Sequence, residues 1–315
     1  MFTMNIELLS LVESVLGSGD KKSRDNYAFY CPSCKHHNKK LEIDMYTNTY
    51  LQNKWGCWVC GFRGRTIRTL FKVLRVSKEK MDKLNSLIKY KADGDEYKDE
   101  KIVYPRSFNF IKEYNNLKGY DRLFAKTSIK YLEKRNVLFD DIVKYNIGIS
   151  TDGYFKNRII FPSYDSDGIL NYYTGRNIIE NGMPSYLFPE SSKNIIPYES
   201  HINFSEPVVL CEGVFDAIAI RNNAIPLLGK FVSENLHDSL VTKSNDIYIC
   251  MDRDAMKEAL KLGLEYKSYG KNVHIVELPE KDPSEMGWEE VNKLIRKTPI
   301  LSDRKILEMK FNYNI

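Results

Sequence analysis

The chain has no long apolar run. No segment of its 315 residues approaches the ~20 uninterrupted apolar residues of a membrane helix, and the N-terminus carries Glu7 and Glu13 where a secretory signal needs a basic start. Internal repeats, low-complexity tracts and a G-x-x-x-x-G-K-[ST] phosphate-binding loop are also missing. These absences predict a soluble, non-secreted, cytoplasmic protein with no membrane partner and no fused helicase.

Charge is modest in total but unevenly distributed. Hydrophobic residues make up 43% of the chain and charged residues 28%, which is enough for packed cores in one large or two to three ordinary domains. The formal net charge is +5, yet residues 1–90 hold 16 Lys and Arg against 8 Asp and Glu, while the remainder holds 31 against 34. A basic end favours a nucleic-acid partner there, although surface lysines alone would give the same count.

Cysteine is scarce, and its spacing is informative. Of the six cysteines, Cys211 and Cys250 each end an apolar run, which predicts buried thiols at strand ends. The other four form two C-x-x-C pairs, and they supply the four thiolates of a tetrahedral zinc site. A redox dithiol is the alternative, but it needs one pair only. The predicted zinc ligands are Cys31, Cys34, Cys57 and Cys60.

Aromatic residues surround these cysteines and are interleaved with lysines and arginines. This combination is typical of a face that stacks on bases and pairs with phosphates, although a mini-domain of this size could use the same rings as its core. Short strands and a helical run at 67–74 complete a metal-stapled unit, predicted over residues 1–76. The rings concerned are Tyr27, Phe29, Tyr30, Trp55, Trp58 and Phe62.

Composition and periodicity divide the rest of the chain. A polar linker is predicted over 77–118, followed by a subdomain at 119–204 that begins with helical spacing and continues as a hairpin around an Asp-Gly turn. From residue 207, apolar strands alternate with helices, which predicts a parallel α/β domain over 205–290. Residues 291–315 form either a tail that binds a partner or a closing helix.

Acidic residues follow three of these predicted strands. Glu212 comes directly after VVLC, Asp252 and Asp254 after the strand IYIC, and Asp282 after VHIVEL. Taken singly, each acid suits a helix cap or a solvated turn. Because the carboxyl ends of parallel strands meet at one crevice, the four carboxylates should converge there, and a divalent cation would offset their repulsion. Oxygen-only ligands suit magnesium or manganese.

The order of these motifs resembles a known family. E-G-x-x-D, then a strand ending in D-x-D, then K-D-P is similar to the TOPRIM fold of primases, topoisomerases and some nucleases. NRIIFPSYDSDG, TGR at 174–176, PSYLFPESSK and NIIPYE resemble the polymerase core of bacterial and phage DNA primases. The resemblance implies an α/β protein with an N-terminal zinc ribbon, an α+β polymerase subdomain and a parallel-sheet TOPRIM domain. Four cysteines, in place of three and a histidine, favour a phage-type member.

The resemblance also implies an activity. It predicts a DNA primase of the replication primosome, an enzyme with DNA-directed RNA polymerase activity that joins ribonucleoside triphosphates into short primers on single-stranded DNA by two-metal nucleotidyl transfer. A replicative helicase would be its partner. A TOPRIM nuclease and a non-catalytic, template-binding accessory protein are the alternatives.

Site residues carry over by position. Glu212 would bridge the metal ions or act as a base, Asp252 and Asp254 would be magnesium or manganese ligands, and Asp282 would be an auxiliary catalytic acid. Ser284 stands where bacterial members often have a further acid, for which Glu285 is a candidate substitute. Nucleotide or template binding falls to Arg158, Arg176 and Lys193, and supporting positions are Gly213, Asp216 and Gly229.

Overall fold

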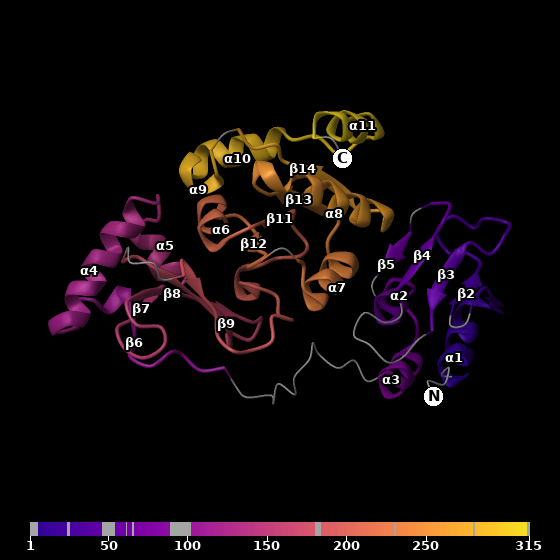
Figure 1. The fold of residues 1–315 in the computed structure, drawn as a ribbon, viewed down its shortest axis with the longest axis horizontal. Coiled ribbons are helices and arrows are strands. Elements are labelled where there is room, and N and C mark those ends of the chain that lie inside the picture. Colours follow the sequence, from indigo (N-terminus) through magenta and orange to yellow (C-terminus); the bar gives the residue numbers. More distant parts are fainter. Residues whose placement is uncertain are drawn as a thin grey trace.

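A computed structural model shows three sheets in the described part of the chain (Figure 1). It describes residues 6–23, 26–45, 54–60, 62–64, 66–88, 102–179, 184–229, 231–279 and 281–313. The first sheet lies at one end of the molecule, the second at the other end and the third between them (Figure 1). The α/β fold class predicted from the sequence is confirmed.

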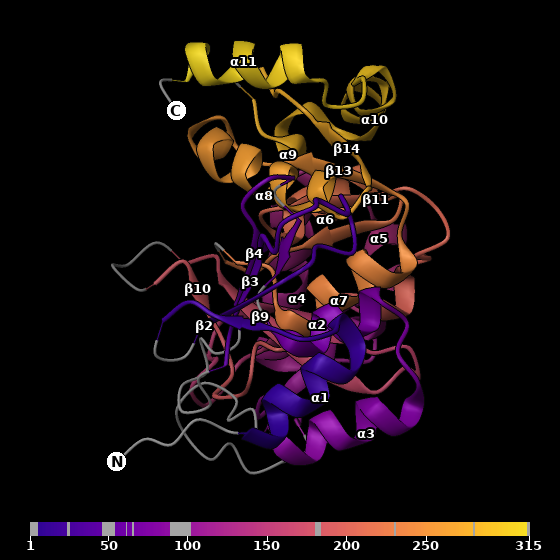
Figure 2. The same ribbon diagram turned by 90° about the vertical axis from the view of Figure 1, so that its right-hand side faces the viewer.

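The first sheet, with its helices, is called here the ribbon unit, residues 6–88. Its short strands are all antiparallel and follow chain order, because successive strands are joined by tight connections around the paired cysteines. Figure 2 shows α1 and α3 side by side at its base. Its elements are α1 (Ile6–Leu16), β1 (Asp20–Lys21), β2 (Asn26–Phe29), β3 (Leu41–Asp44), β4 (Trp55–Cys57), β5 (Arg63–Gly64), α2 (Ile67–Val73) and α3 (Lys78–Leu87).

The second sheet is antiparallel, in the order β10-β9-β8-β7-β6. Its centre is the predicted hairpin, in which Arg158 pairs with Asn177 and Phe161 with Thr174 around the Asp-Gly turn. Its elements are β6 (Phe108–Phe110), η1 (Ile111–Glu113), α4 (Gly119–Glu133), α5 (Phe139–Lys144), β7 (Gly148–Ser150), β8 (Arg158–Tyr164), β9 (Leu170–Asn177), β10 (Tyr186–Leu187) and η2 (Glu199–His201).

The third sheet is parallel, in the order β12-β11-β13-β14, which confirms the predicted alternation of strands and helices. The reversal of strand order at β11 opens the crevice in which α/β sheets bind ligands. Its elements are β11 (Val208–Cys211), α6 (Val214–Ile220), β12 (Ala224–Pro226), α7 (Glu234–Lys243), β13 (Asp246–Cys250), η3 (Arg253–Ala255), α8 (Met256–Ser268) and β14 (Asn272–Ile275).

Three further helices follow the third sheet: α9 (Pro283–Met286), α10 (Trp288–Lys297) and α11 (Asp303–Asn312). Val291 and Ile295 of α10 are buried with residues of the second and third sheets. Met309 of α11 is buried in a core cluster with residues of the third sheet and its helices. Both helices therefore contribute to the core. No helix in the described segments is long and apolar enough to cross a membrane.

Two apolar cores sandwich the third sheet. One lies between the second and third sheets, where Phe161 of β8 stacks edge-on against Phe215 of α6 at 5.1 Å between ring centroids. The other lies under α7 and α8 and includes Leu240 and Tyr266. Because the first core is shared, the second and third sheets form one packed body.

The predicted linker over 77–118 is wrong at both of its ends. Residues 78–87 form α3, whose Leu84 is buried in the ribbon core together with Ile88. Residues 108–110 form β6, which pairs with β7, and Ile111 is buried in the shared core. Leu84 is the one buried residue among the ten of α3, and β6 has only three residues, so neither element has an apolar period that the sequence reveals. Part of the segment, 89–101, lies outside the described residues.

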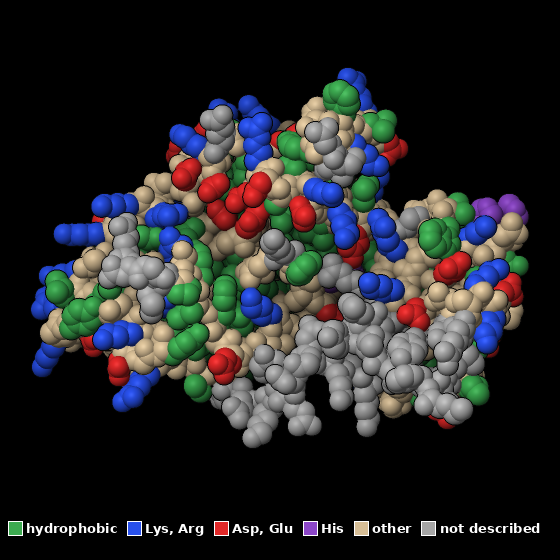
Figure 3. All heavy atoms as spheres, in the orientation of Figure 1, with side chains coloured by type: hydrophobic (Ala, Val, Ile, Leu, Met, Phe, Trp, Pro, Cys, Tyr) green, Lys and Arg blue, Asp and Glu red, His purple; other side chains and the backbone are tan. Residues whose placement is uncertain are grey.

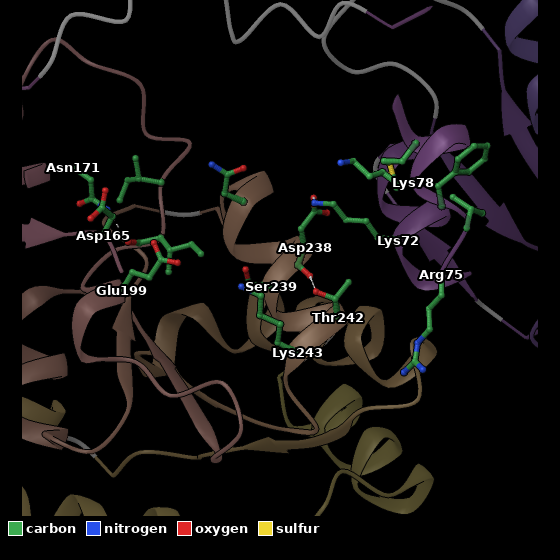
Figure 4. A pocket seen from close by; sticks show the side chains of 16 residues that line it. Lys72, Arg75, Lys78, Asp165, Asn171, Glu199, Asp238, Ser239, Thr242 and Lys243 are labelled. Atoms are coloured by element: carbon green, nitrogen blue, oxygen red, sulfur yellow. Dashed lines mark hydrogen bonds and ion pairs between the residues drawn. The ribbon is translucent and has the colours of Figure 1, made fainter. Parts of the chain in front are cut away.

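The ribbon unit contacts the third sheet through α2, α7 and α8. The Asp238 carboxylate of α7 is buried; it accepts a hydrogen bond from Thr69 Oγ1 at 2.6 Å and pairs with the Lys72 ammonium. The ring of Tyr269, which follows α8, lies edge-on to Trp55 with 5.9 Å between the ring centroids. A Cβ atom at Gly64 would clash with the Tyr269 hydroxyl. Figure 4 shows the cavity of about 850 Å³ beside this interface, with Lys72 reaching Asp238.

Candidate metal centres and nucleic-acid site

The four predicted zinc ligands lie together in the ribbon unit. One ligand atom from each cysteine falls within 4.8 Å of all the others. Cys31 Sγ is 3.7 Å from Cys60 Sγ, and Cys34 Sγ is 3.8 Å from Cys57 Sγ. A tetrahedron of thiolates with metal bonds of ~2.3 Å has edges of about 3.8 Å. The donor set therefore fits structural zinc, as predicted.

Burial shows why this cluster needs a cation. The Cys31 thiol is buried, and this burial raises its pKa to about 12. A group with such a pKa stays protonated at neutral pH, whereas a metal ligand must be the thiolate. A bound divalent cation would supply the opposing charge. Cys211 and Cys250 are free, buried thiols on β11 and β13, as their positions predicted.

The aromatic residues of the ribbon unit divide into two sets. Four are buried in its core: Tyr27, Phe29, Trp55 and Phe62. Two remain exposed, with 77% of Trp58 and 52% of Tyr30 accessible to solvent. The core interpretation therefore holds for the first set. The second set keeps flat faces available for stacking, and the Lys39 ammonium lies 5.6 Å from the Tyr30 ring centroid.

Carboxylates from two parallel strands meet at the third sheet. β11 and β13 are neighbours, with Cys211 opposite Cys250, so the residues that follow them emerge side by side. Glu212, Asp252 and Asp254 place one carboxylate oxygen each within 4.8 Å of the others. Glu212 Oε1 also accepts a hydrogen bond from the Asp252 backbone N–H at 3.1 Å. Figure 3 shows Asp and Glu side chains gathered on this face.

Mutual repulsion and burial perturb these carboxyl groups. Desolvation, together with the nearby charges of Glu212 and Asp282, raises the pKa of Asp252 to about 7. The pKa of Glu212 is also raised, mainly by desolvation. Carboxylates that resist ionisation when the cluster is metal-free are the groups that a divalent cation stabilises. The cluster therefore fits a catalytic magnesium or manganese ion.

Two further acids surround the cluster without joining it. Asp216 in α6 accepts a hydrogen bond from the Gly213 N–H at 3.1 Å, and desolvation raises its pKa to about 6. Asp282 is the exposed N-cap of α9, and it acts on the cluster through its charge alone. Glu285 is exposed on α9, beyond the ligand set.

Two arginines on the side of the second sheet lie near Tyr186, as does Asp216. Arg176 on β9 donates through Nε to the Tyr131 hydroxyl at 3.0 Å, and its guanidinium lies 5.0 Å from the Tyr186 ring centroid. Arg135 was not among the predicted site residues. Its guanidinium lies 5.4 Å from the ring centroid of Phe215, and Phe215 is three residues after Glu212. Its sequence signal is weak, because Arg135 stands among the other charged residues of the helical stretch that begins the 119–204 subdomain.

The structure also places the other predicted binding residues. Lys193 is exposed; its ammonium lies 4.1 Å from the Phe188 ring centroid and 3.5 Å from the Leu228 carbonyl oxygen. Gly229 follows Leu228 in the exposed turn after β12. The Leu228 N–H donates to the Glu212 carbonyl oxygen at 3.2 Å, so Lys193 lies near the backbone of the acid cluster.

Arg158 does not lie in the crevice wall as a free cation. Only 2% of the residue is exposed, and its guanidinium donates to the backbone carbonyls of Gly175, Pro184 and Ser185 at 2.9–3.5 Å. The prediction that it binds template or nucleotide is therefore wrong for this structure. A strand arginine with a partly apolar neighbourhood gives no sequence signal of this bracing role, because its partners lie on β9 and just before β10.

Comparison with known proteins identifies DNA primases as relatives of this chain. No family model matches the chain. The DNA primase of Buchnera aphidicola is 27% identical over 302 residues, covering 89% of this chain and 47% of that protein. The DNA primase of Thermotoga maritima is 27% identical over 199 residues, covering 57% and 35% respectively. The predicted resemblance to bacterial-type primases is confirmed, and the chain spans about half or less of the length of these relatives.

Two solved primase structures share the fold of the larger part of this chain. A DNA primase domain from Pseudomonas aeruginosa matches 61% of this chain and 78% of its own, at 19% identity and a TM-score of 0.50. A DnaG primase catalytic domain bound to single-stranded DNA matches 64% and 80%, at 21% identity and a TM-score of 0.50. At these identities the comparison shows a shared fold.

Proposed function

We propose that this chain is a DNA primase that synthesises short RNA primers on single-stranded DNA. The observation that carries the proposal is the cluster of Glu212, Asp252 and Asp254 at the ends of two neighbouring parallel strands, together with Arg135 and Arg176 on the side of the second sheet. The similarity to bacterial primases over most of the chain supports it, as does the single-stranded DNA bound to one structural relative. Ribonucleoside triphosphates would be the substrates, and a replicative helicase in the cytoplasm the partner.

The acid cluster would hold magnesium or manganese. Bound there, the cation supplies charge neutralisation for a 3′ hydroxyl attacking an α-phosphate and for the departing pyrophosphate. Asp252 and Asp254 would be ligands, and Glu212, fixed by the Asp252 N–H, would complete the set. Asp282 would add negative charge from the edge of the site without contacting the ion.

Arg135, Arg176 and Lys193 would bind the phosphate groups of the nucleotide or template. Arg176 is oriented by Tyr131, and Arg135 rests on Phe215, so both guanidinium groups are held in place by rigid neighbours. Lys193 lies near the backbone of the acid cluster, through its contact with Leu228. Gly213 leaves space for the Asp216 carboxylate, since a Cβ there would lie 3.3 Å from Asp216 Oδ2. These contacts support a crevice that positions a triphosphate against a template strand.

The domain roles follow from this arrangement. Residues 1–76 would recognise template through exposed Trp58 and Tyr30, residues 119–204 would form the first polymerase subdomain, and residues 205–290 the catalytic domain. We place α3 with the ribbon unit and β6 with the polymerase subdomain, because each packs there.

The test is primer synthesis from unlabelled single-stranded template, labelled ribonucleoside triphosphates and magnesium. Asp254→Asn should reduce the rate by about 100-fold or more, because it removes one carboxylate ligand. Asp246→Asn is the matched control, since Asp246 begins β13 at the opposite end of the strand from the cluster. Template cleavage without RNA product would support the nuclease instead, and template binding without either activity would support the accessory protein.

A further inference from the structure

The outer surface of α4 carries a row of cations outside the proposed crevice. Lys or Arg stands at every fourth position from the N-cap to the C-cap of the helix, and all five residues are exposed. Such residues form an inclined ridge with one cation every ~6 Å over ~24 Å. Figure 3 shows Lys and Arg side chains projecting along the left edge, where Figure 1 places α4. The α4 ridge comprises Lys118, Arg122, Lys126, Lys130 and Lys134.

These charges are not neutralised within the described part of the chain. None of the five forms a salt bridge with another described residue. Asp121 of α4 instead accepts hydrogen bonds from Thr151 Oγ1 at 2.6 Å and Asn109 Nδ2 at 3.5 Å. Glu133 is the other acid of the helix, at its last turn. Like charges four residues apart destabilise a helix, so a polyanion bound along the ridge would relieve their repulsion.

The ridge is also independent of the packing that holds α4. Phe124, Ala125, Ser128 and Leu132 form the buried face of the helix. The five cations lie outside this face, so the ridge charges are available to a ligand without disturbing the core. Substitutions that keep a long polar side chain should leave the helix intact.

The ridge leads to the acid crevice. Tyr131, in the last turn of α4, accepts the hydrogen bond from Arg176, and Arg135 directly follows Lys134. Asn136 Nδ2 donates to the Ser284 carbonyl oxygen at 3.0 Å, which joins this end of α4 to α9, the helix whose N-cap is Asp282. A strand leaving the crevice past Arg135 therefore meets the ridge cations in succession.

We propose that the α4 ridge binds the sugar-phosphate backbone of single-stranded nucleic acid as it leaves the acid crevice. The identity of this strand as the template rests on the proposed function. Ridge lysines and arginine contact phosphates and carry no base recognition, so the binding is independent of sequence and sensitive to salt. The ridge increases the affinity for templates long enough to span it.

Fluorescence anisotropy of labelled dT30 over a series of salt concentrations tests the ridge without nucleotides. The double variant is Arg122→Gln with Lys126→Gln, which loses two phosphate contacts. The slope of the logarithm of the binding constant against the logarithm of the salt concentration should fall in magnitude by about 1.4, and binding should weaken about 25-fold at 0.1 M salt. The matched control is Arg304→Gln with Lys310→Gln, which removes two exposed cations from α11. The control should keep the wild-type slope, and circular dichroism should show both variants folded.

Primer synthesis on long template gives a second readout. The ridge variant should raise the KM for template with kcat unchanged, because the ridge lies outside the reacting groups. Equal losses of affinity in ridge and control variants would mean that net charge alone matters, and this would overturn the proposal. An unchanged slope in the ridge variant would also overturn it and leave α4 as a surface for a protein partner. Absence of RNA product from wild-type protein bears on the proposed function alone, since dT30 binding is measured separately.

Discussion

Magnesium binding to the acid cluster should release protons at pH 6.5 but not at pH 8.5. The pKa of Asp252 is raised to about 7 in the metal-free protein, so about 0.8 of this carboxyl is protonated at pH 6.5 and almost none at pH 8.5. A metal ligand must be ionised, and binding therefore displaces that proton. The apparent affinity for magnesium should rise with pH until about pH 7 and then level off.

The same shift predicts how stability depends on pH without metal. Asp252 has a higher pKa in the folded protein than in the unfolded chain, so the folded state binds the extra proton between about pH 4 and pH 7. Metal-free protein should lose stability as the pH rises through this window. The full shift corresponds to about 4 kcal/mol, and partial solvent exposure of the carboxylate reduces the expected effect to about 1–2 kcal/mol.

Isothermal titration calorimetry in two buffers of different ionisation enthalpy measures the proton release, and thermal unfolding in chelator measures the stability. Asp252→Asn should remove the part of the metal-free stability loss that Asp252 contributes, because the amide does not titrate, whereas Glu212 and Asp216, whose pKa values are also raised, should retain theirs. Asp246→Asn, on the same strand, should retain the whole stability loss. A proton release that is equal at pH 6.5 and pH 8.5, or a stability profile unaltered by Asp252→Asn, would refute the reasoning.

Two further changes test other parts of the structure. Cys57→Ser should abolish zinc binding, measured by metal analysis, and hydrogen exchange should show residues ~20–75 unprotected while the third sheet stays protected; zinc retained at one equivalent would contradict the ligand set. Asp238→Ala should weaken the contact between the ribbon unit and α7 by about 1–3 kcal/mol, because it leaves the buried Thr69 hydroxyl without its acceptor; unchanged exchange protection of α2 would contradict this.

The parts of the molecule with local signals were predictable from the sequence. The C-x-x-C pairs place four thiolates by spacing alone, and the apolar strands from residue 207 alternate with amphipathic helices. Acidic residues at strand ends converge because parallel strands share a direction, so Glu212 and Asp252 met as expected. In each case the information lies within a few residues of the feature.

Features that depend on distant contacts were not predictable. The role of Arg158 depends on carbonyl groups of β9 and of the segment before β10, and α3 depends on burial of Leu84 against the rest of the ribbon unit. The pairing of Lys72 with Asp238 joins residues 166 positions apart. Periodicity and propensity carry no signal for such pairs, because either residue alone suits a solvated helix surface.

The contacts of the ribbon unit bear on how a template strand would reach the acid cluster under the proposed function. Tyr269 precedes β14 and therefore lies at the amino end of the third sheet, whereas Glu212 and Asp252 follow β11 and β13 at the carboxyl end. A ribbon unit held by Asp238 and Tyr269 is thus fixed near the amino ends of the strands, whereas the acid cluster lies at their carboxyl ends. If its exposed Trp58 reads template, the ribbon must leave this interface, or the template must extend around the sheet. Asp238→Ala separates the two routes: release of the ribbon speeds initiation in the first case and slows it in the second.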